Sequence, residues 1–239
     1  MNTFRGPFRL MMREMSMTFY INVCITFVLF VFYNILGYIG VAESGSFILF
    51  GPLFVVFLLY PFINFTSYQY ILSLGGTRKQ FVLAFYLSAA IYSVLSGVIL
   101  NLFYLFTTLL TSGNYLFHFA KFIHTTNWLI YFWIDFSWIF FLFSLGMLAK
   151  TVWFNYGTAF LLAASTLLLI LGTIAVIFGD MSIFITTFFE HHLKFVAILF
   201  GLSIVFLLLS YSLMKNAPLE KGGRLNFKQY KRNNVVIHR

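Results

Sequence analysis

The stretch TVWFNYGTAFLLAASTLLLILGTIAVIFG, residues 151–179, contains no charged side chain. About 20 apolar residues in a helix span the hydrocarbon core of a bilayer. Further uncharged runs of at least about this length occur at 15–42, 44–77, 80–120 and 195–214. A sixth apolar region, 127–148, is interrupted only by Asp135. The sequence therefore predicts an all-α integral membrane protein.

The composition excludes a water-soluble domain. Hydrophobic residues make up 61% of the 239-residue chain and charged residues only 9%, whereas a soluble domain carries about a quarter charged residues. Six spans are predicted, at 17–40, 47–67, 81–109, 127–148, 156–178 and 195–214. The first apolar run lacks the small-residue exit of a cleavable signal peptide, so we expect it to remain as an anchor. These spans form one transmembrane domain, 17–214, between an amino-terminal segment, 1–16, and a tail, 215–239.

The basic residues predict the orientation. Six spans place both termini on one side of the membrane, and thirteen of the fifteen Lys and Arg residues then share that side. Because basic residues concentrate on the cytoplasmic side, both termini are expected to be cytoplasmic. Seven of these residues lie in the tail, which predicts attraction to anionic lipid, with contact to a partner protein as the alternative. No folded nucleic-acid reader accompanies them, so nucleic acid is not an expected partner.

The segment before the first span predicts an amphipathic helix. Arg5, Arg9 and Arg13 recur at i, i+4 and i+8 and so lie on one helical face, the arginine stripe. Apolar residues separate these arginines. Such a helix is expected to lie in the membrane interface with its basic face toward the lipid headgroups.

The connection between the second and third spans, TSYQYILSLGGTRKQF at 66–81, is the most informative segment. Its apolar residues Tyr70, Ile71 and Leu74 stand at i, i+1 and i+4, which predicts a short helix lying along the membrane surface. A plain turn between two spans needs only a few polar residues, whereas this segment also contains a predicted helix, which suggests a further role. A connector with no further role nevertheless remains an alternative.

Helix stop and start signals follow this short helix. Gly75 and Gly76 predict its end, because glycine tolerates the positive φ that a helix terminus commonly needs. Thr77, with Gln80 three residues later, predicts a capping box at the start of the third span. Arg78 and Lys79 then lie in the first turn of the third span, where two cations are unfavourable toward the helix dipole. Phosphate headgroups or a protein partner are therefore expected to hold them.

The run ILSLGGTRKQF resembles the first cytoplasmic loop of bacterial type-2 ABC exporter permeases, where an S/T-R-K/R-x-F element follows a short coupling helix. In that family the helix docks on a separate nucleotide-binding subunit, which binds ATP and Mg²⁺ and drives the membrane spans. The resemblance implies that the bacterial cytoplasmic membrane is the location and that a second permease, a copy or a paralogue, completes the assembly. The residues implied to contact the ATPase are Tyr70, Ile71, Leu74, Gly75, Gly76, Thr77, Arg78 and Lys79.

The resemblance extends to the architecture of the chain. Members of this family have an amphipathic helix before the first span, six spans with both ends inside, and a partly re-entrant hairpin between spans five and six. The apolar outer segment 179–194 is longer than a turn requires and fits such a hairpin. Irregular backbone at membrane depth is tolerated only when it is buried in protein.

The chain lacks the signatures of an enzyme. It contains no G-x-x-x-x-G-K-[ST] phosphate loop, no H-E-x-x-H and no G-x-S-x-G motif. The five histidines are scattered, and the single cysteine, Cys24, cannot form an intrachain disulfide or a thiolate cluster. No catalytic residue, metal site or bound cofactor is therefore predicted in this chain.

Asp135 is the clear ionisable residue within a predicted span. A carboxylate at that depth is costly and is expected to face the helix bundle or a wet cavity. It could belong to the transport pathway or a permease interface, pair with Asn, Ser or Tyr of a neighbouring helix, or snorkel. Glycines within the spans, at 97, 146, 157 and 172, are expected to permit close helix packing.

The predicted function is ATP-driven export of an apolar or amphipathic cargo, such as a peptide, an antibiotic or a lipid-like molecule. The scarcity of charge inside the spans favours such a cargo, because a strongly ionic one would need countercharges along its route. Exporters of antimicrobial peptides fit best within the family. An ATP-independent transporter and a membrane scaffold or immunity protein remain the alternatives.

Overall fold

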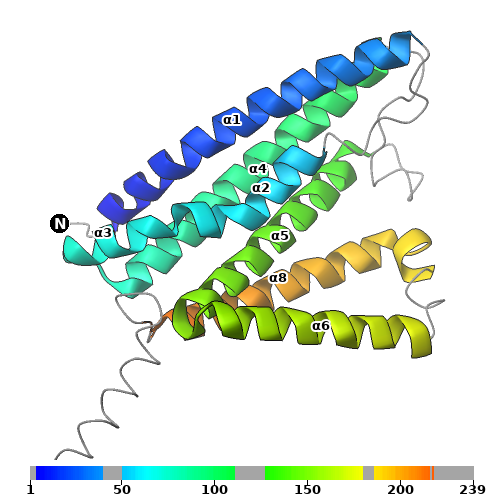
Figure 1. Ribbon diagram of the computed structural model, residues 1–239. Coiled ribbons are helices and arrows are strands. Elements are labelled where there is room, and N and C mark those ends of the chain that lie inside the picture. The colour runs from blue at the N-terminus through cyan, green and yellow to red at the C-terminus, as the bar shows by residue number, and fades with distance from the viewer. Residues whose placement is uncertain (1–3, 40–49, 111–126, 180–185, 216, 218–239) are drawn as a thin grey trace, which may run out of the picture.

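The computed structural model describes residues 4–39, 50–110, 127–179, 186–215 and 217 (Figure 1). Helices connected by short turns make up these residues. Six of the helical segments are long and apolar enough to cross a membrane. This confirms the predicted all-α class with six spans, and the chain is a multi-pass membrane protein.

Helix α1 (Arg5–Tyr38) joins the predicted amphipathic segment and the first span in one helix of 34 residues. Pro7 lies in its first turn, where the missing N–H is not needed, so the helix is not interrupted there. The arginine stripe is exposed, whereas Met11 and Met15 are buried against the bundle. At about 50 Å the helix is longer than the hydrocarbon core. The amino-terminal turns thus continue the first span as one helix and pack on its neighbours, and their position in the membrane interface stays a prediction.

The second span is built from three consecutive segments: α2 (Phe50–Ile63), the 3₁₀ turn η2 (Asn64–Thr66) and α3 (Ser67–Ser73). Pro61 lies near the end of α2 and cannot donate the hydrogen bond that continues an α-helix. The tighter 3₁₀ turn follows directly. The three segments together form one candidate span, Leu53–Ser73, so the short helix predicted along the membrane surface is the last part of that span.

The remaining spans are α4 (Arg78–Leu110), α5 (Trp128–Tyr156), α6 (Thr158–Phe178) and α8 (His192–Lys215). The fourth span thus extends well beyond its predicted end at residue 148. Gly157 alone joins α5 to α6, with φ 87° and ψ 179°, a conformation essentially restricted to glycine. Its N–H donates to the Trp153 carbonyl at 2.9 Å, which completes the last turn of α5.

Helix α5 is the centre of the bundle and packs against α8, α2, α4 and α6, while α1 packs on α4. Gly146 allows the close approach of α5 to α2, because a Cβ at this position would meet the Leu58 backbone, with its carbonyl carbon at 3.0 Å. Gly97 is packed under the Phe132 ring, whereas Gly172 faces open space. Helix α6 contains no buried residue, and within the described part of the chain it contacts mainly α5.

The spans alternate in direction, so the first turn of α1, the α3–α4 connection, the α5–α6 junction and the last turn of α8 lie at one end of the bundle (Figure 1). Seven of the eight Lys and Arg residues in the described part of the chain lie there, and we name it the basic end. Lys194 lies at the opposite end. Part of the predicted re-entrant segment, 180–185, and nearly all of the basic tail are outside the described residues; residues 186–189 are helical and a turn leads from them into α8.

Candidate functional site

The α3–α4 connection at the basic end is closed by a Schellman motif. Gly75 has φ 83°, the left-handed conformation that favours glycine. The Gly76 N–H donates to the Ile71 carbonyl at 2.8 Å, and the Gly75 N–H donates to the Leu72 carbonyl at 3.1 Å. A Cβ on Gly76 would lie 2.7 Å from the Ile71 oxygen, so both positions require glycine. The predicted glycine stop is confirmed.

The start of α4 carries the predicted capping box. The Gln80 side-chain oxygen accepts from the Thr77 N–H at 2.8 Å, and the Thr77 hydroxyl accepts from the Gln80 N–H at 3.2 Å. Both donors would otherwise lack a helical partner. Stop and cap follow each other without an intervening flexible residue, so the connection holds a defined shape.

The fold buries one of the three apolar residues of the short helix, Tyr70, Ile71 and Leu74, and leaves the other two exposed. Ile71 is only 3% exposed and belongs to the core, whereas Tyr70 is 65% exposed and Leu74 is 83% exposed. The core contacts arise because α3 continues a membrane span and turns its Tyr68 and Ile71 face toward α4. Of the three apolar residues among the predicted contact residues, only Tyr70 and Leu74 are therefore open to a partner.

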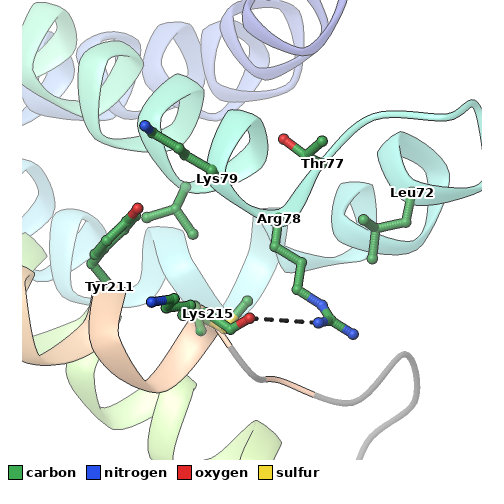
Figure 2. A pocket seen from close by; sticks show the side chains of 8 residues that line it. Leu72, Thr77, Arg78, Lys79, Tyr211 and Lys215 are labelled. Carbon is green, nitrogen blue, oxygen red and sulfur yellow. Dashed lines mark hydrogen bonds between the residues drawn. The ribbon is translucent and has the colours of Figure 1, made fainter.

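Arg78 is held by the end of a distant helix. Its Nη1 donates to the carbonyl oxygen of Lys215, the last residue of α8, in a long hydrogen bond of 3.5 Å (Figure 2). The last carbonyls of a helix lack intrahelical partners and carry the negative end of the dipole. The cation that is unfavourable at the start of α4 is thus favourable at the end of α8. Arg78 also interacts with the Tyr68 hydroxyl.

A cavity of about 450 Å³ lies between the α3–α4 connection and the last turns of α8 (Figure 2). We name it the basic pocket, because Arg78, Lys79 and Lys215 line it. Its other lining residues are Leu72, Thr77, Val82, Tyr211 and Met214. The contribution of α8 could not be predicted from the sequence, since its residues stand more than a hundred positions from Arg78 and no local pattern connects them.

Asp135 is fully buried in α5 and contacts α4. The Asn101 side-chain amide donates to Asp135 Oδ2 at 3.1 Å and to the Gly97 carbonyl at 2.9 Å. The structural partner considered in the sequence analysis, an Asn on a neighbouring helix, is therefore present. This pair lies inside the bundle, far along α4 from the basic pocket.

Lys150 occupies an aromatic cage that the sequence analysis also missed. Its side chain is buried, and Nζ lies 4.1 Å from the Trp153 ring centroid, 5.2 Å from that of Phe65 and 5.4 Å from that of Phe62. Aromatic faces attract cations at such distances. The cage therefore fixes α5 against the end of α2 and the turn η2.

Comparisons with protein-family models, curated proteins and solved structures find no match for this chain. Within the part of the chain that the structure describes, no group of three or more His, Cys, Asp or Glu residues could hold a metal ion.

Proposed function

We propose that this chain is the membrane permease subunit of an ATP-driven exporter, and that a separate ATPase subunit docks on the α3–α4 connection. The observation that carries the proposal is the pair of exposed apolar side chains, Tyr70 and Leu74, at the tip of the bundle. They stand on a short helix fixed by a Schellman motif and a capping box. A rigid element with an apolar face suits the transmission of movement between subunits.

The orientation in this proposal places the basic end in the cytoplasm. The excess of Lys and Arg at that end supports it through the positive-inside rule. Both termini are then cytoplasmic. The α3–α4 connection lies on the same side, where a cytoplasmic ATPase could reach it. The bacterial cytoplasmic membrane remains the proposed location, on the strength of the family resemblance.

The proposed cargo is apolar or amphipathic, such as a peptide, an antibiotic or a lipid-like molecule. Asp135, about two turns from the start of α5, is buried against Asn101 rather than exposed along a route. A second permease, a copy of this chain or a paralogue, is proposed to complete the assembly. The apolar surface of α6, which lacks any buried residue, supplies area for a partner or for lipid.

Co-purification tests the docking site. We would isolate the tagged chain from its native membranes in mild detergent, measure ATP hydrolysis in the purified fraction and identify bound subunits by mass spectrometry. Replacing both Tyr70 and Leu74 with alanine should release the ATPase, because both side chains are exposed and their loss leaves the core intact. The matched control replaces Trp128 and Leu129, which are 55% and 65% exposed at the opposite end.

The reversal of Arg78 to Glu would be a poorer test, because it also removes the contact with the end of α8. If the chain purifies alone and supports no ATP hydrolysis, the proposed function is wrong. An ATP-independent transporter or a membrane scaffold would then be the better-supported function. If the ATPase binds equally well to the double variant, docking lies elsewhere on the chain.

A further inference from the structure

The basic pocket combines two kinds of surface that a single ligand would have to match. Its floor is apolar, because Val82 and Met214 are buried and stand beside Leu72. Lys79 and Lys215 are exposed at its rim. In Figure 2 their amines point to the same side of the pocket as the Tyr211 hydroxyl, away from the Arg78 guanidinium. An anion with an apolar extension fits this arrangement better than a small inorganic ion.

The pocket also lies at the depth of lipid headgroups. Helix α8 has 24 residues, which corresponds to a length of about 36 Å. The hydrocarbon core measures about 30 Å and the bilayer with headgroups about 40–45 Å. Lys215, at the end of this helix, therefore falls at the level of the phosphates, as does Lys79 in the facing first turn of α4.

We infer that the basic pocket binds an anionic phospholipid, with the phosphate between Lys79 and Lys215 and the upper part of an acyl chain on the floor formed by Val82 and Met214. Arg78 keeps the pocket open by holding the end of α8 beside the start of α4. The lipid thus connects the two helices through its headgroup. This site is distinct from the exposed Tyr70 and Leu74, so it does not depend on an ATPase docking there.

The test uses the purified full-length chain alone in nanodiscs of phosphatidylcholine, with or without phosphatidylglycerol. Acylation of lysine amines is measured residue by residue by mass spectrometry. Phosphatidylglycerol should slow the modification of Lys79 and Lys215. Lys194 is an exposed internal control at the opposite end of the bundle, where it meets the same headgroups of the other leaflet but does not line the basic pocket. The rate of its acylation should therefore not change.

Variants separate a pocket from general surface attraction. Binding of a fluorescent phosphatidylglycerol should weaken roughly fivefold for each of Lys79→Gln and Lys215→Gln, since a surface cation contributes on this scale. The variant with both Arg9→Gln and Arg13→Gln removes two charges from the exposed arginine stripe, one more than either lysine variant, and should still bind as the parent does. Met214→Asp should also weaken binding, because it places a charge on the apolar floor.

Three results would overturn the assignment. Equal losses in the arginine and lysine variants would indicate diffuse attraction to the membrane surface. Equal protection of Lys79 by inorganic phosphate or glycerol phosphate in phosphatidylcholine nanodiscs would indicate a free phosphate compound instead of a lipid. Protection only when a partner subunit is added, with no response to phosphatidylglycerol, would assign the pocket to a protein.

Discussion

Replacing Gly146 with alanine should force α5 away from α2. The added Cβ would lie 3.0 Å from the Leu58 carbonyl carbon and 3.2 Å from its Cα, and closer still to its carbonyl oxygen. Carbon atoms in good contact are about 3.5–4.0 Å apart, so the two helices must separate by roughly 0.5–1 Å. The obstacle is backbone, which cannot rotate aside as a side chain can.

The expected cost follows from two opposing terms. Overpacking a core costs about 1–3 kcal/mol, and a backbone contact places Gly146 at the upper end of that range. Alanine gains up to about 1 kcal/mol over glycine in helix propensity. We therefore expect Gly146→Ala to lower the free energy of unfolding by roughly 2 kcal/mol.

Gly172 and Gly201 provide matched controls, since a Cβ at either position meets nothing within 4 Å. Alanine at these positions should leave stability unchanged or raise it by up to about 1 kcal/mol. Unfolding can be followed by fluorescence of the four tryptophans as sodium dodecyl sulfate is added to mild-detergent micelles. The cleanest measure is the difference between Gly146→Ala and the controls, which is expected to be about 3 kcal/mol.

The close packing of α2 and α5 would be refuted if Gly146→Ala behaved as the two controls do. A second check uses Leu58→Ala combined with Gly146→Ala. Because the contact is with the Leu58 backbone, truncating its side chain should not restore stability. Full restoration would show that the obstacle is the side chain, and the reasoning from the backbone distance would be wrong.

Two buried polar residues give further predictions in the same unfolding assay. Asp135→Asn should cost less than Asp135→Leu, by about 1–3 kcal/mol, because an asparagine oxygen still accepts from Asn101 whereas leucine leaves this amide with one partner fewer; the reverse order would exclude the Asn101 bond as the reason for burial. Lys150→Met keeps the aliphatic length but loses the attraction of the Trp153 ring, so a loss of about 1 kcal/mol is expected. A gain in stability would show that burial of the amine costs more than the aromatic cage returns.

The six spans could be predicted from the sequence because each depends only on a local run of mainly apolar residues. Their ends could not all be predicted. The fourth span was expected to stop before Lys150, on the assumption that a lysine marks the membrane surface. In the structure Lys150 lies inside the continuous helix α5, since Phe62 and Phe65 of the second span cover its amine. That cover comes from residues more than eighty positions away.

The α3–α4 connection shows the same division between local and distant causes. Gly75, Thr77 and Gln80 form the predicted stop and capping box, because these bonds join residues within five positions of one another. The burial of Ile71 was not predicted, since it depends on the packing of α3 against α4 in the bundle. The sequence pattern predicted the stop and the cap of this connection but could not separate its buried face from its exposed face.

The contact between Arg78 and the end of α8 allows movement of the α3–α4 connection to be transmitted to the helices of the bundle. Arg78 joins the start of α4 to Lys215 at the end of α8, and the Tyr86 hydroxyl adds a second link by donating to the Leu207 carbonyl at 2.9 Å. Helix α8 in turn packs extensively on the central helix α5. A push on the exposed Tyr70 and Leu74 would therefore reach α5 through α8 as well as through α4. If an ATPase docks there as proposed, weakening the Arg78 contact should uncouple ATP hydrolysis from transport while leaving ATPase binding intact.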